Sequence, residues 1–370
     1  MKLTGLKLTN YRNCNDLFLN FDKMKVLIIG KNAQGKTNIL ESIYFLSTLK
    51  TPRTSNITEL INFNRNYFRI DADIVKSNTD ISMSYTYNSE KKREVKLNNV
   101  KSTIKDFKSV LKTVLFASSD LLLLRGTPQD RRDWLDRAIS QVYPAYDDRL
   151  TKYEKIRTQK NNFLKACAKA GTMDEDLLEV FNEQLAITGS NIIYIRKKYL
   201  KEIEKIALPK HKTISETEEL SIKYDCSFLD KDYEIEDIEE IKNKFNLSLQ
   251  ERMQEEIRRC QSCVGPHRDD IIFYINNQEA TKFASQGQQR TIVLSLKLSE
   301  LDIITQKTGD EPILLLDDVL AELDDIRQNY LLKSINPQTQ TIITSVDTIL
   351  FEDEFLKDVQ IYKIDNGNCI

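Results

Sequence analysis

Long apolar runs are missing from the sequence. No stretch of its 370 residues approaches the ~20 consecutive apolar residues that a membrane-spanning helix requires, so we expect no membrane partner. The segment from Met1 to Asn20 contains Lys2 and Lys7 but lacks the apolar core of a secretory signal peptide. These absences favour a cytoplasmic protein.

Cysteine is scarce and scattered. The six cysteines lie at positions 14, 167, 226, 260, 263 and 369. Cys260 and Cys263 are close in sequence, but no second pair follows at the spacing of a zinc site, and nothing nearby resembles a thioredoxin-like motif. We therefore interpret this pair as structural, and the pattern is consistent with a reducing compartment.

A strong net charge is also absent. The 54 Lys and Arg residues and 56 Asp and Glu residues leave a formal charge of −2, which gives no overall attraction to nucleic acid. Residues 151–170 are basic and residues 214–256 are acidic, but such runs are more typical of solvated helix faces. Any DNA contact must come from local patches, for which the candidate phosphate contacts are Arg53, Arg65, Lys91, Lys92 and Arg93.

One motif stands out against this ordinary composition. Residues 30–37 read Gly-Lys-Asn-Ala-Gln-Gly-Lys-Thr and match G-x-x-x-x-G-K-[ST], the P-loop of nucleotide-binding proteins. An apolar strand is expected before it, over residues 25–29, and a helix after it, over residues 38–49. This order of strand, loop and helix is the context that the motif requires, so the sequence predicts a site for ATP and Mg²⁺.

The parts of this loop have predicted roles. Backbone N–H groups at a glycine-rich turn and at a helix start favour negative charge. Lys36 is expected to reach the β- and γ-phosphates, and the Thr37 hydroxyl is expected to ligate Mg²⁺. The expected nucleotide contacts are Gly30, Lys31, Asn32, Ala33, Gln34, Gly35, Lys36, Thr37 and Asn38.

A second motif supplies carboxylates. Residues 312–318 read Pro-Ile-Leu-Leu-Leu-Asp-Asp, an apolar strand that ends in two acids, as in a Walker B motif. Asp317 is expected to hold Mg²⁺ directly or through water, and Asp318 to polarise the attacking water. The predicted catalytic residues are therefore Lys36, Asp317 and Asp318, and the predicted metal ligands are Thr37 and Asp317.

The order of expected elements indicates one α/β domain that is interrupted by a helical insertion. Apolar and polar residues alternate in several early segments, as in half-buried strands; they are 3–9, 17–21, 68–74 and 81–87. The insertion is charged and helical, with helices expected over 131–143, 146–170, 174–206 and 235–259, the third ended by Pro209. The predicted divisions are 1–127, 128–262 and 263–370.

Another phosphate-facing helix start is expected far along the chain. Ser285 and Gly287 precede or open a helix expected over residues 286–305, and such a helix N-terminus favours an anion. One γ-phosphate needs both helix starts only if they come from different protomers.

Family resemblance enters at these residues. Residues 285–289 resemble the signature motif of ABC-type ATPases, and residues 321–324 resemble their D-loop. The whole chain resembles the RecF family of these ABC-type, SMC-like ATPases. The motifs that carry this resemblance are residues 10–13, 30–38, 126–136, 265–270, 285–290 and 316–324.

The resemblance implies an α/β fold, an ABC-type ATPase head with an inserted, mainly helical arm. It implies a weak, DNA-stimulated ATPase that forms an ATP-dependent homodimer on DNA at single-stranded gaps and single-strand/double-strand junctions. It also implies partnership with RecO and RecR in loading RecA. Further nucleotide contacts implied by the resemblance are Arg12, Ser285, Gly287, Gln288 and Asp324; for Arg12 a structural role or a DNA contact fits equally well.

Some positions depart from the pattern of ABC transporters. Asp318 stands where transporters usually have Glu, and a shorter carboxylate suggests slow hydrolysis. Ser345 and Asp347 occupy the region of the usual switch His, and Ala33 replaces a common Gly. An alternative function is the ATP-binding subunit of an ABC membrane transporter, but these departures and the charged helical insertion argue against it.

Overall fold

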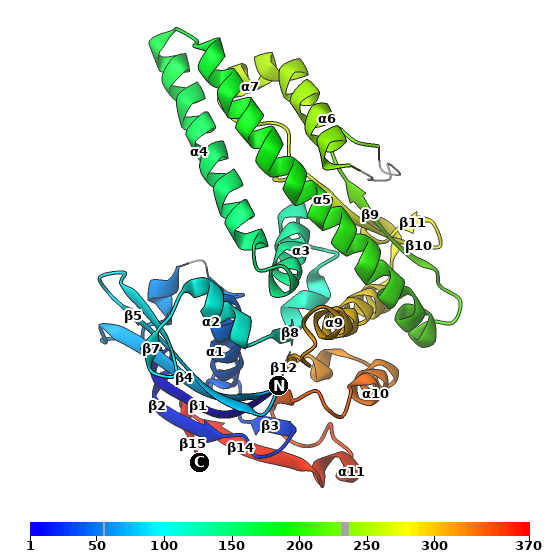
Figure 1. The fold of residues 1–370 in the computed structure, drawn as a ribbon. Helices are drawn as coiled ribbons and strands as arrows, with labels where there is room; N and C mark the ends of the chain where they lie inside the picture. Colours follow the sequence, from blue (N-terminus) through cyan, green and yellow to red (C-terminus); the bar gives the residue numbers. More distant parts are fainter. Residues whose placement is uncertain (55, 231–236) are drawn as a thin grey trace. The chain divides into compact units, whose positions relative to one another are not determined.

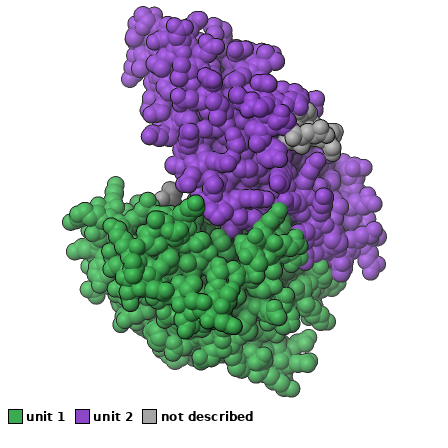
Figure 2. Space-filling view, in the orientation of Figure 1, with its two compact units in different colours: residues 1–122, 290–370 green, residues 123–289 purple. Residues whose placement is uncertain are grey.

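The computed structural model describes residues 1–54, 56–230 and 237–370. Two compact units divide the chain: residues 1–122 with 290–370 form the first, and residues 123–289 form the second (Figure 2). Residues 263–289 thus belong to the second unit, whereas the sequence grouped them with the first. The predicted domain boundaries themselves stay a prediction.

The first unit contains an antiparallel sheet. Its six strands lie in the order β2-β1-β4-β5-β6-β7 (Figure 1). The alternating segments expected from the sequence are strands of this sheet, and their apolar side chains face the core. The strands are β1 (Lys2–Tyr11), β2 (Cys14–Asn20), β4 (Tyr67–Lys76), β5 (Thr79–Asn88), β6 (Arg93–Leu97) and β7 (Val100–Lys101).

A second sheet in this unit has a parallel centre. Its order is β15-β14-β3-β13-β12-β8, and its strands are β3 (Lys25–Ile29), β8 (Thr113–Ala117), β12 (Ile313–Asp317), β13 (Thr341–Ser345), β14 (Val359–Asp365) and β15 (Asn368–Cys369). Strands β3 and β12 were predicted, and β14 was not. Because parallel strands end at the same edge, the P-loop after β3 and Asp317 at the end of β12 meet there.

Helix α1 (Lys36–Thr48) lies between the two sheets. It packs on β8, β12 and β13 of the parallel sheet. On the other side, Phe45 meets Tyr85 of β5 and Phe68 of β4 edge-on, with ring centroids 4.9 Å and 6.1 Å apart. The remaining helices of this unit are η1 (Ile57–Leu60), α2 (Ile104–Val110), η2 (Ser118–Leu122), η3 (Leu320–Glu322), α10 (Asp325–Ser334) and α11 (Asp353–Leu356), and α9 (Gln286–Thr308) begins in the second unit.

The second unit is built on a helical hairpin of α4 (Tyr146–Ala170) and α5 (Glu175–Ile214), preceded by α3 (Pro128–Val142) (Figure 1). Arg149 of α4 donates to Asn191 of α5, and Phe163, further along α4, stacks against Phe181, nearer the start of α5. The residues of α5 that contact α4 lie progressively earlier in α5 as α4 advances, so the two helices form an antiparallel hairpin.

The prediction that Pro209 ends the long helix was wrong. Helix α5 continues through Pro209 to Ile214, although an interior proline removes one intrahelical hydrogen bond and costs about 3 kcal/mol. Tertiary contacts hold the extra turn. His211 is fully buried, and its Nε2 lies 3.1 Å from Glu218 Oε2, while Thr213 Oγ1 donates to the Pro209 carbonyl.

A small antiparallel sheet completes the second unit. Its order is β11-β10-β9, with β9 (Leu220–Asp225), β10 (Asp270–Ile275) and β11 (Gln278–Glu279), next to helices α6 (Ile238–Glu251), α7 (Met253–Arg259) and α8 (Ala280–Phe283). Because β10 pairs with β9, residues 270–275 belong to this unit, although they follow residue 262, the predicted end of the insertion. The expected helix 235–259 is interrupted at Arg252, and its first two residues lie outside the described chain. No helix in the described ranges is long and apolar enough to cross a membrane.

Candidate nucleotide-binding site

The P-loop leaves β3 and runs into the first turn of α1, as the motif predicts. Gly35 adopts a φ of 111°, and a Cβ at this position would lie 2.7 Å from Asn13 Oδ1, so a larger residue would be both strained and crowded. Ala33, which replaces a common glycine, adopts a left-handed φ of 66°. The loop therefore retains the backbone path of a phosphate-binding turn.

A cavity of about 470 Å³ opens over this loop. Its walls come from the first unit, and the lining residues are Asn13, Asn32, Ala33, Gln34, Gly35, Lys36, Thr37, Asn38, Arg53 and Asp318. Seven of the nine predicted loop contacts line it. Gly30 and Lys31 do not line the cavity, and their carbonyls accept hydrogen bonds from Lys36.

Lys36 is buried beneath the loop without a counter-ion. Lys36 is only 3% exposed. Its Nζ donates to the carbonyl of Gly30 at 2.7 Å and to that of Lys31 at 3.2 Å. It forms no ion pair with any residue that the structure describes. A buried ammonium held only by carbonyl dipoles favours an incoming anion, which fits the phosphates of a nucleotide.

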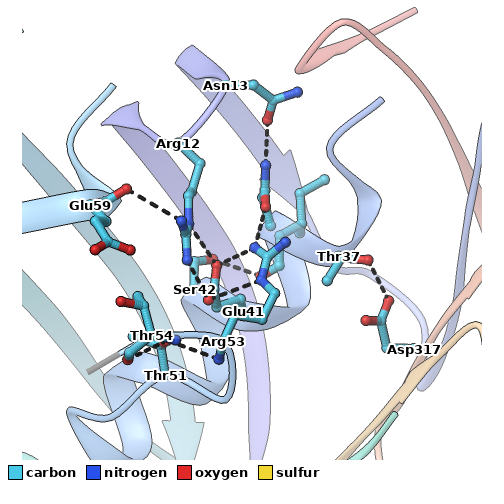
Figure 3. Close-up of polar contacts among 12 residues, drawn as sticks. Arg12, Asn13, Thr37, Glu41, Ser42, Thr51, Arg53, Thr54, Glu59 and Asp317 are labelled. Atoms are coloured by element: carbon cyan, nitrogen blue, oxygen red, sulfur yellow. Dashed lines mark hydrogen bonds and ion pairs between the residues drawn. The ribbon is translucent and has the colours of Figure 1, made fainter. Parts of the chain in front are cut away.

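Thr37 and Asp317 meet across the sheet edge, from sequence positions far apart (Figure 3). Thr37 Oγ1 donates to Asp317 Oδ1 at 2.9 Å, and Thr344 Oγ1 donates to the same oxygen at 2.9 Å. Burial raises the pKa of Asp317, while the hydrogen bonds from Thr344 and Thr37 act in the opposite direction. A bound cation would favour the charged carboxylate at this position.

These oxygens fit Mg²⁺ better than a metal that demands a complete protein cage. Mg²⁺ prefers oxygen ligands and usually keeps several waters and phosphate oxygens in its shell, so one carboxylate and one hydroxyl suffice. Within the described ranges, no group of three or more His, Cys, Asp or Glu side chains could hold a metal. The donor set therefore matches a nucleotide-associated Mg²⁺ at Thr37 and Asp317.

Asp318 follows the metal-ligand candidate and lines the cavity. It adopts a left-handed φ of 51°, and its backbone N–H donates to Thr344 Oγ1 at 2.9 Å. Thr344 therefore orients both acids. Thr344 was not predicted as a site residue, because its position beside β12 depends on the sheet order.

Next to the cavity, Glu41 holds two arginines (Figure 3). This carboxylate is buried on α1 and accepts from Arg12 Nε at 3.1 Å, from Arg12 Nη2 at 2.9 Å and from Arg53 Nε at 3.2 Å. Burial alone would raise the pKa of Glu41, but the hydrogen bonds from Arg53 and Arg12 outweigh burial and lower it. Glu41 was not predicted as a site residue.

The structure places both arginines differently from what the sequence predicted. Arg12, an implied nucleotide contact, does not line the cavity and is held by Glu41 and the Glu59 carbonyl. Arg53, which the sequence suggested as a DNA contact, does line the cavity and also bonds to Asn38. Only the fold shows that Arg53 belongs to the nucleotide site.

The P-loop is braced from behind by two segments that the sequence did not connect with it. Asn13 Nδ2 donates to the Gln34 carbonyl at 3.1 Å and Asn13 Oδ1 accepts from Asn38 Nδ2 at 2.6 Å. The turn between β14 and β15 adds two bonds: Gly367 N–H to the Gln34 carbonyl at 2.8 Å and Asn366 N–H to Gln34 Oε1 at 2.5 Å.

The signature-like residues lie elsewhere. Ser285, Gly287 and Gln288 belong to the second unit and do not line the cavity. Ser285 Oγ accepts from the Gln288 N–H at 3.3 Å, and Gln288 Oε1 accepts from the Ser285 N–H at 2.7 Å, which caps the start of α9. Asp324 caps α10 through the Arg327 N–H at 2.9 Å and is also outside the cavity lining.

Comparisons with known proteins show the family to which this chain belongs. The family model described as RecF/RecN/SMC N terminal domain matches residues 2–368. The chain is 40% identical to the DNA replication and repair protein RecF of Bacillus pumilus, and the 372 aligned residues cover 100% of both chains. With the same coverage, it is 39% identical to the protein of that name in Bacillus subtilis.

Solved structures agree. One described as the recombination mediator protein RecF-ATP in the RecFOR pathway is 33% identical, has a TM-score of 0.91, and is matched over 100% of this chain and 96% of its own. An Smc head bound to the C-winged helix domain of ScpA is 12% identical with a TM-score of 0.54, which shows the fold alone. The expected α/β architecture, an ABC-type head with a helical arm, is therefore confirmed, and the chain belongs to the RecF family.

Proposed function

We propose that this chain is an ATP-dependent DNA-binding protein of recombinational repair. In this proposal, ATP and Mg²⁺ bind at the P-loop, ATP brings two copies together on DNA, and slow hydrolysis releases them. The observation that carries the proposal is the convergence of Lys36, Thr37 and Asp318 on one cavity over the P-loop, with Asp317 bonded to Thr37 at its edge. The solved relative whose name includes ATP supports the choice of nucleotide.

The chain's own residues then divide the work. Loop N–H groups and Lys36 Nζ hold phosphate oxygens, which are charge-assisted bonds in a buried setting. Thr37 and Asp317 would hold Mg²⁺, which when bound neutralises the developing phosphate charge. Asp318 orients and polarises the attacking water, as a residue on the cavity wall with a backbone fixed by Thr344. Its shorter side chain accounts for slow, weak hydrolysis.

A second copy completes the site in this proposal. The cavity is lined by the P-loop, Arg53 and Asp318 of one chain, without Ser285, Gly287 or Gln288. These three residues lie at the start of α9, and the dipole of a helix N-terminus favours a phosphate. We infer that the Ser285 region of one protomer closes over ATP held by Lys36 of the other, with Asp324 nearby, so that ATP stabilises the dimer.

DNA and partner proteins follow from the family. The curated relatives are DNA replication and repair proteins, and a solved relative belongs to the RecFOR pathway. We propose that the dimer acts at single-stranded gaps and single-strand/double-strand junctions, that DNA stimulates the ATPase, and that RecO and RecR are partners in loading RecA. The alternative, a transporter subunit, has no corresponding relative among these matches.

The test uses two matched variants of the full chain. Lys36→Arg impairs the P-loop, and Ser285→Arg blocks the second anion site. We expect sedimentation analysis to show an ATP-dependent dimer for the natural chain and for neither variant alone. Because a mixed dimer contains one intact site, mixing the variants should restore dimerisation and up to half of the junction-stimulated ATPase. Absence of any ATP-dependent dimer of the natural chain contradicts the proposal.

A further inference from the structure

An aromatic side chain projects from the first unit with almost no contacts. Phe63 lies in the segment between η1 and β4 and is 88% exposed, more than any other large hydrophobic residue in the described chain. Tyr67, at the start of β4, is 42% exposed. Exposing a whole phenyl ring to water is unfavourable by about 2 kcal/mol relative to burying it, so an anchored ring in this position calls for an explanation.

The segment that carries Phe63 is firmly tied to its neighbours. Asn62 N–H donates to the Asn10 carbonyl at 2.8 Å, and Arg65 N–H donates to the Asn62 carbonyl at 3.0 Å. Ser89 N–H, from the next hairpin, donates to the Asn66 carbonyl at 2.7 Å. The bonds on both sides of Phe63 fix the backbone, so the ring is held outward by a defined turn.

The neighbouring hairpin turn is also well defined, and it is basic. Asn88 N–H donates to the Lys92 carbonyl, and Lys91 N–H donates back to the Asn88 carbonyl. Lys92 N–H also donates to Asn88 Oδ1 at 2.9 Å. Because Tyr67 pairs with Asn88 across the two strands, this turn and the Phe63 segment lie at the same end of the sheet.

Most of the cations here are not neutralised. Arg65, Lys91 and Arg93 are exposed and form no ion pair with other residues in the described ranges. Lys92 pairs with Glu90 at 2.7 Å, which is the only carboxylate of the turn. By contrast, Arg69 on the adjoining strand is paired with Asp71. The unpaired charges are therefore concentrated around the two exposed aromatics.

This combination suits DNA bases better than a protein surface. A protein interface usually has a contiguous apolar centre, whereas Phe63 and Tyr67 are surrounded by amide and cationic groups. Single-stranded nucleic acid is bound by an aromatic platform that stacks on bases, together with cations that follow the phosphates. We propose that residues 62–67 and 89–93, the Phe63 surface, bind DNA with unpaired bases, and that Phe63 stacks on a base where a single strand leaves a duplex.

This inference rests on the proposed DNA-binding function and makes it more specific. Arg65, Lys91 and Arg93 would contact phosphates on either side of the stacked base. Phosphate contacts bind any sequence and weaken with salt, while stacking needs an unpaired base. The two parts of the surface therefore have separable signatures in solution.

The first experiment compares Phe63→Ala, Phe63→Trp and the control Phe18→Ala in the full chain with ATP and Mg²⁺. Phe18 is also exposed, at 57%, but lies on β2, two strands away from β4. Binding is measured to a single-strand/double-strand junction and to a blunt duplex, with 2-aminopurine at the junction. We expect Phe63→Ala to weaken junction binding by about 10-fold and to abolish 2-aminopurine quenching, with duplex binding unchanged. Phe63→Trp and Phe18→Ala should resemble the natural chain.

The second experiment measures the salt dependence of junction binding. Arg65→Gln, Lys91→Gln and Arg93→Gln should each lower the slope of log affinity against log salt by about 0.7–0.9, the value for one phosphate contact. Phe63→Ala should leave this slope unchanged, because it removes no charge. Lys101→Gln, an exposed lysine on β7, is the matched control and should leave both slope and affinity unchanged.

The outcomes separate this inference from the proposed function. If the natural chain binds neither junction nor duplex, the proposed function fails. If it binds the junction and Phe63→Ala binds equally well with full quenching, only the Phe63 surface is wrong. If Phe63→Ala instead abolishes the ATP-dependent dimer, Phe63 belongs to a protein interface, and the inference is overturned.

Discussion

Two buried lysines distinguish the two units of this molecule. Lys36 in the first unit is 3% exposed and is held by carbonyl oxygens only. Lys160 in the second unit is fully buried and faces the carboxylate of Glu256, with Nζ and Oε2 2.5 Å apart. The first lysine is arranged to receive an anion, whereas the second already has one. Similar burial therefore serves ligand binding in one unit and internal structure in the other.

Other polar groups follow the same division. In the second unit, Arg196 bonds to both carboxylate oxygens of Asp136, to Tyr224 and to the Pro266 carbonyl, which links α3, α5, β9 and the segment before β10. In the first unit, the hydroxyl and carboxylates near the P-loop line or adjoin a cavity. In the arm unit Lys160 and Arg196 face carboxylates of the same unit, whereas in the head unit Lys36 is bonded to carbonyl oxygens of the P-loop.

The largest expected effect is on Lys160. Lys160→Met retains the aliphatic stem but leaves Glu256 charged, buried and unpaired, which should lower the free energy of unfolding by about 3–5 kcal/mol. Urea denaturation followed by the fluorescence of Trp134 measures this, because Trp134 is the single tryptophan and lies in the second unit. Lys160→Met with Glu256→Gln should recover most of the loss, and Lys165→Met, on the exposed face of α4, should have little effect. A single variant as stable as the natural chain contradicts the comparison.

The same lysine-to-methionine substitution at Lys36, in the first unit, should change ATP binding. Lys36→Met leaves no buried carboxylate unpaired, so in the same Trp134 measurement it should lower the free energy of unfolding much less than Lys160→Met does. ATP affinity should fall by about 100-fold or more, since a charge-assisted phosphate contact is lost. Titration with a fluorescent ATP analogue measures this, and Lys105→Met, at an exposed lysine on α2, is the control. Unchanged ATP affinity would mean that Lys36 is structural, like Lys160.

A histidine of the second unit predicts acid sensitivity. Burial and nearby arginines lower the pKa of His267 to about 3, and its ring accepts from or donates to Tyr153 and Ser262 in the neutral form. A depressed folded pKa means that stability is present above the unfolded pKa of about 6.5 and is lost as pH falls towards 3. Protonation of His267 alone should therefore lower the free energy of unfolding by about 2 kcal/mol between pH 7 and pH 5.

Asp269 changes the stability in the opposite direction over the same pH range. Burial raises its pKa to about 6, so folding is favoured as pH falls through 6, which partly masks the histidine. His267→Gln isolates the histidine contribution. We expect its unfolding free energy to decline less than that of the natural chain from pH 7 to pH 5, again reported by Trp134. Parallel pH curves would show that His267 does not carry the acid sensitivity.

The smallest expected effect is on the brace behind the P-loop. A Cβ at Gly367 would lie 2.4 Å from the Asn13 carbonyl oxygen, so Gly367→Ala should displace Asn13 and weaken ATP binding by about 3- to 10-fold, or roughly 0.7–1.4 kcal/mol. Gly309→Ala is the matched control, because Gly309 has a similar positive φ of 75° but no atom within 4 Å of an added Cβ. Equal losses of ATP affinity in both variants would assign the effect to backbone strain.

Much of the fold followed from local patterns. Alternating residues predicted β1, β4 and β5, and the helix boundaries of α4 agree with the sequence because Gly171 takes the left-handed conformation that ends it. The patterns failed where packing overrides them. Pro209 remains within α5. Strand β14 was not predicted, because its exposed positions break the alternation of apolar residues.

The site was predictable to the extent that it is contiguous in sequence. The P-loop and the two acids after β12 carry their own signatures, and their meeting follows from the edge of a parallel sheet. Glu41, Arg53 and Thr344 have no such signature, and the motif at residues 10–13 does not reveal that Asn13 contacts the P-loop, because these roles depend on which segments the fold brings together. The predicted contacts at Ser285, Gly287, Gln288 and Asp324 stay predictions, since the cavity of one chain does not include them.

The sequence by itself determined the phosphate-binding loop, the acids of the metal site and the helical character of the insertion. Each depends on neighbouring residues, whose spacing decides backbone geometry and amphipathic faces. The fold alone shows that, among the described residues, Lys36 is held by carbonyls and Lys160 by a carboxylate, that the turn at Gly367 contacts the P-loop, and that Phe63 lies near cations without ion pairs. Those relations join segments distant in sequence, and chain folding, not local propensity, brings them within bonding distance.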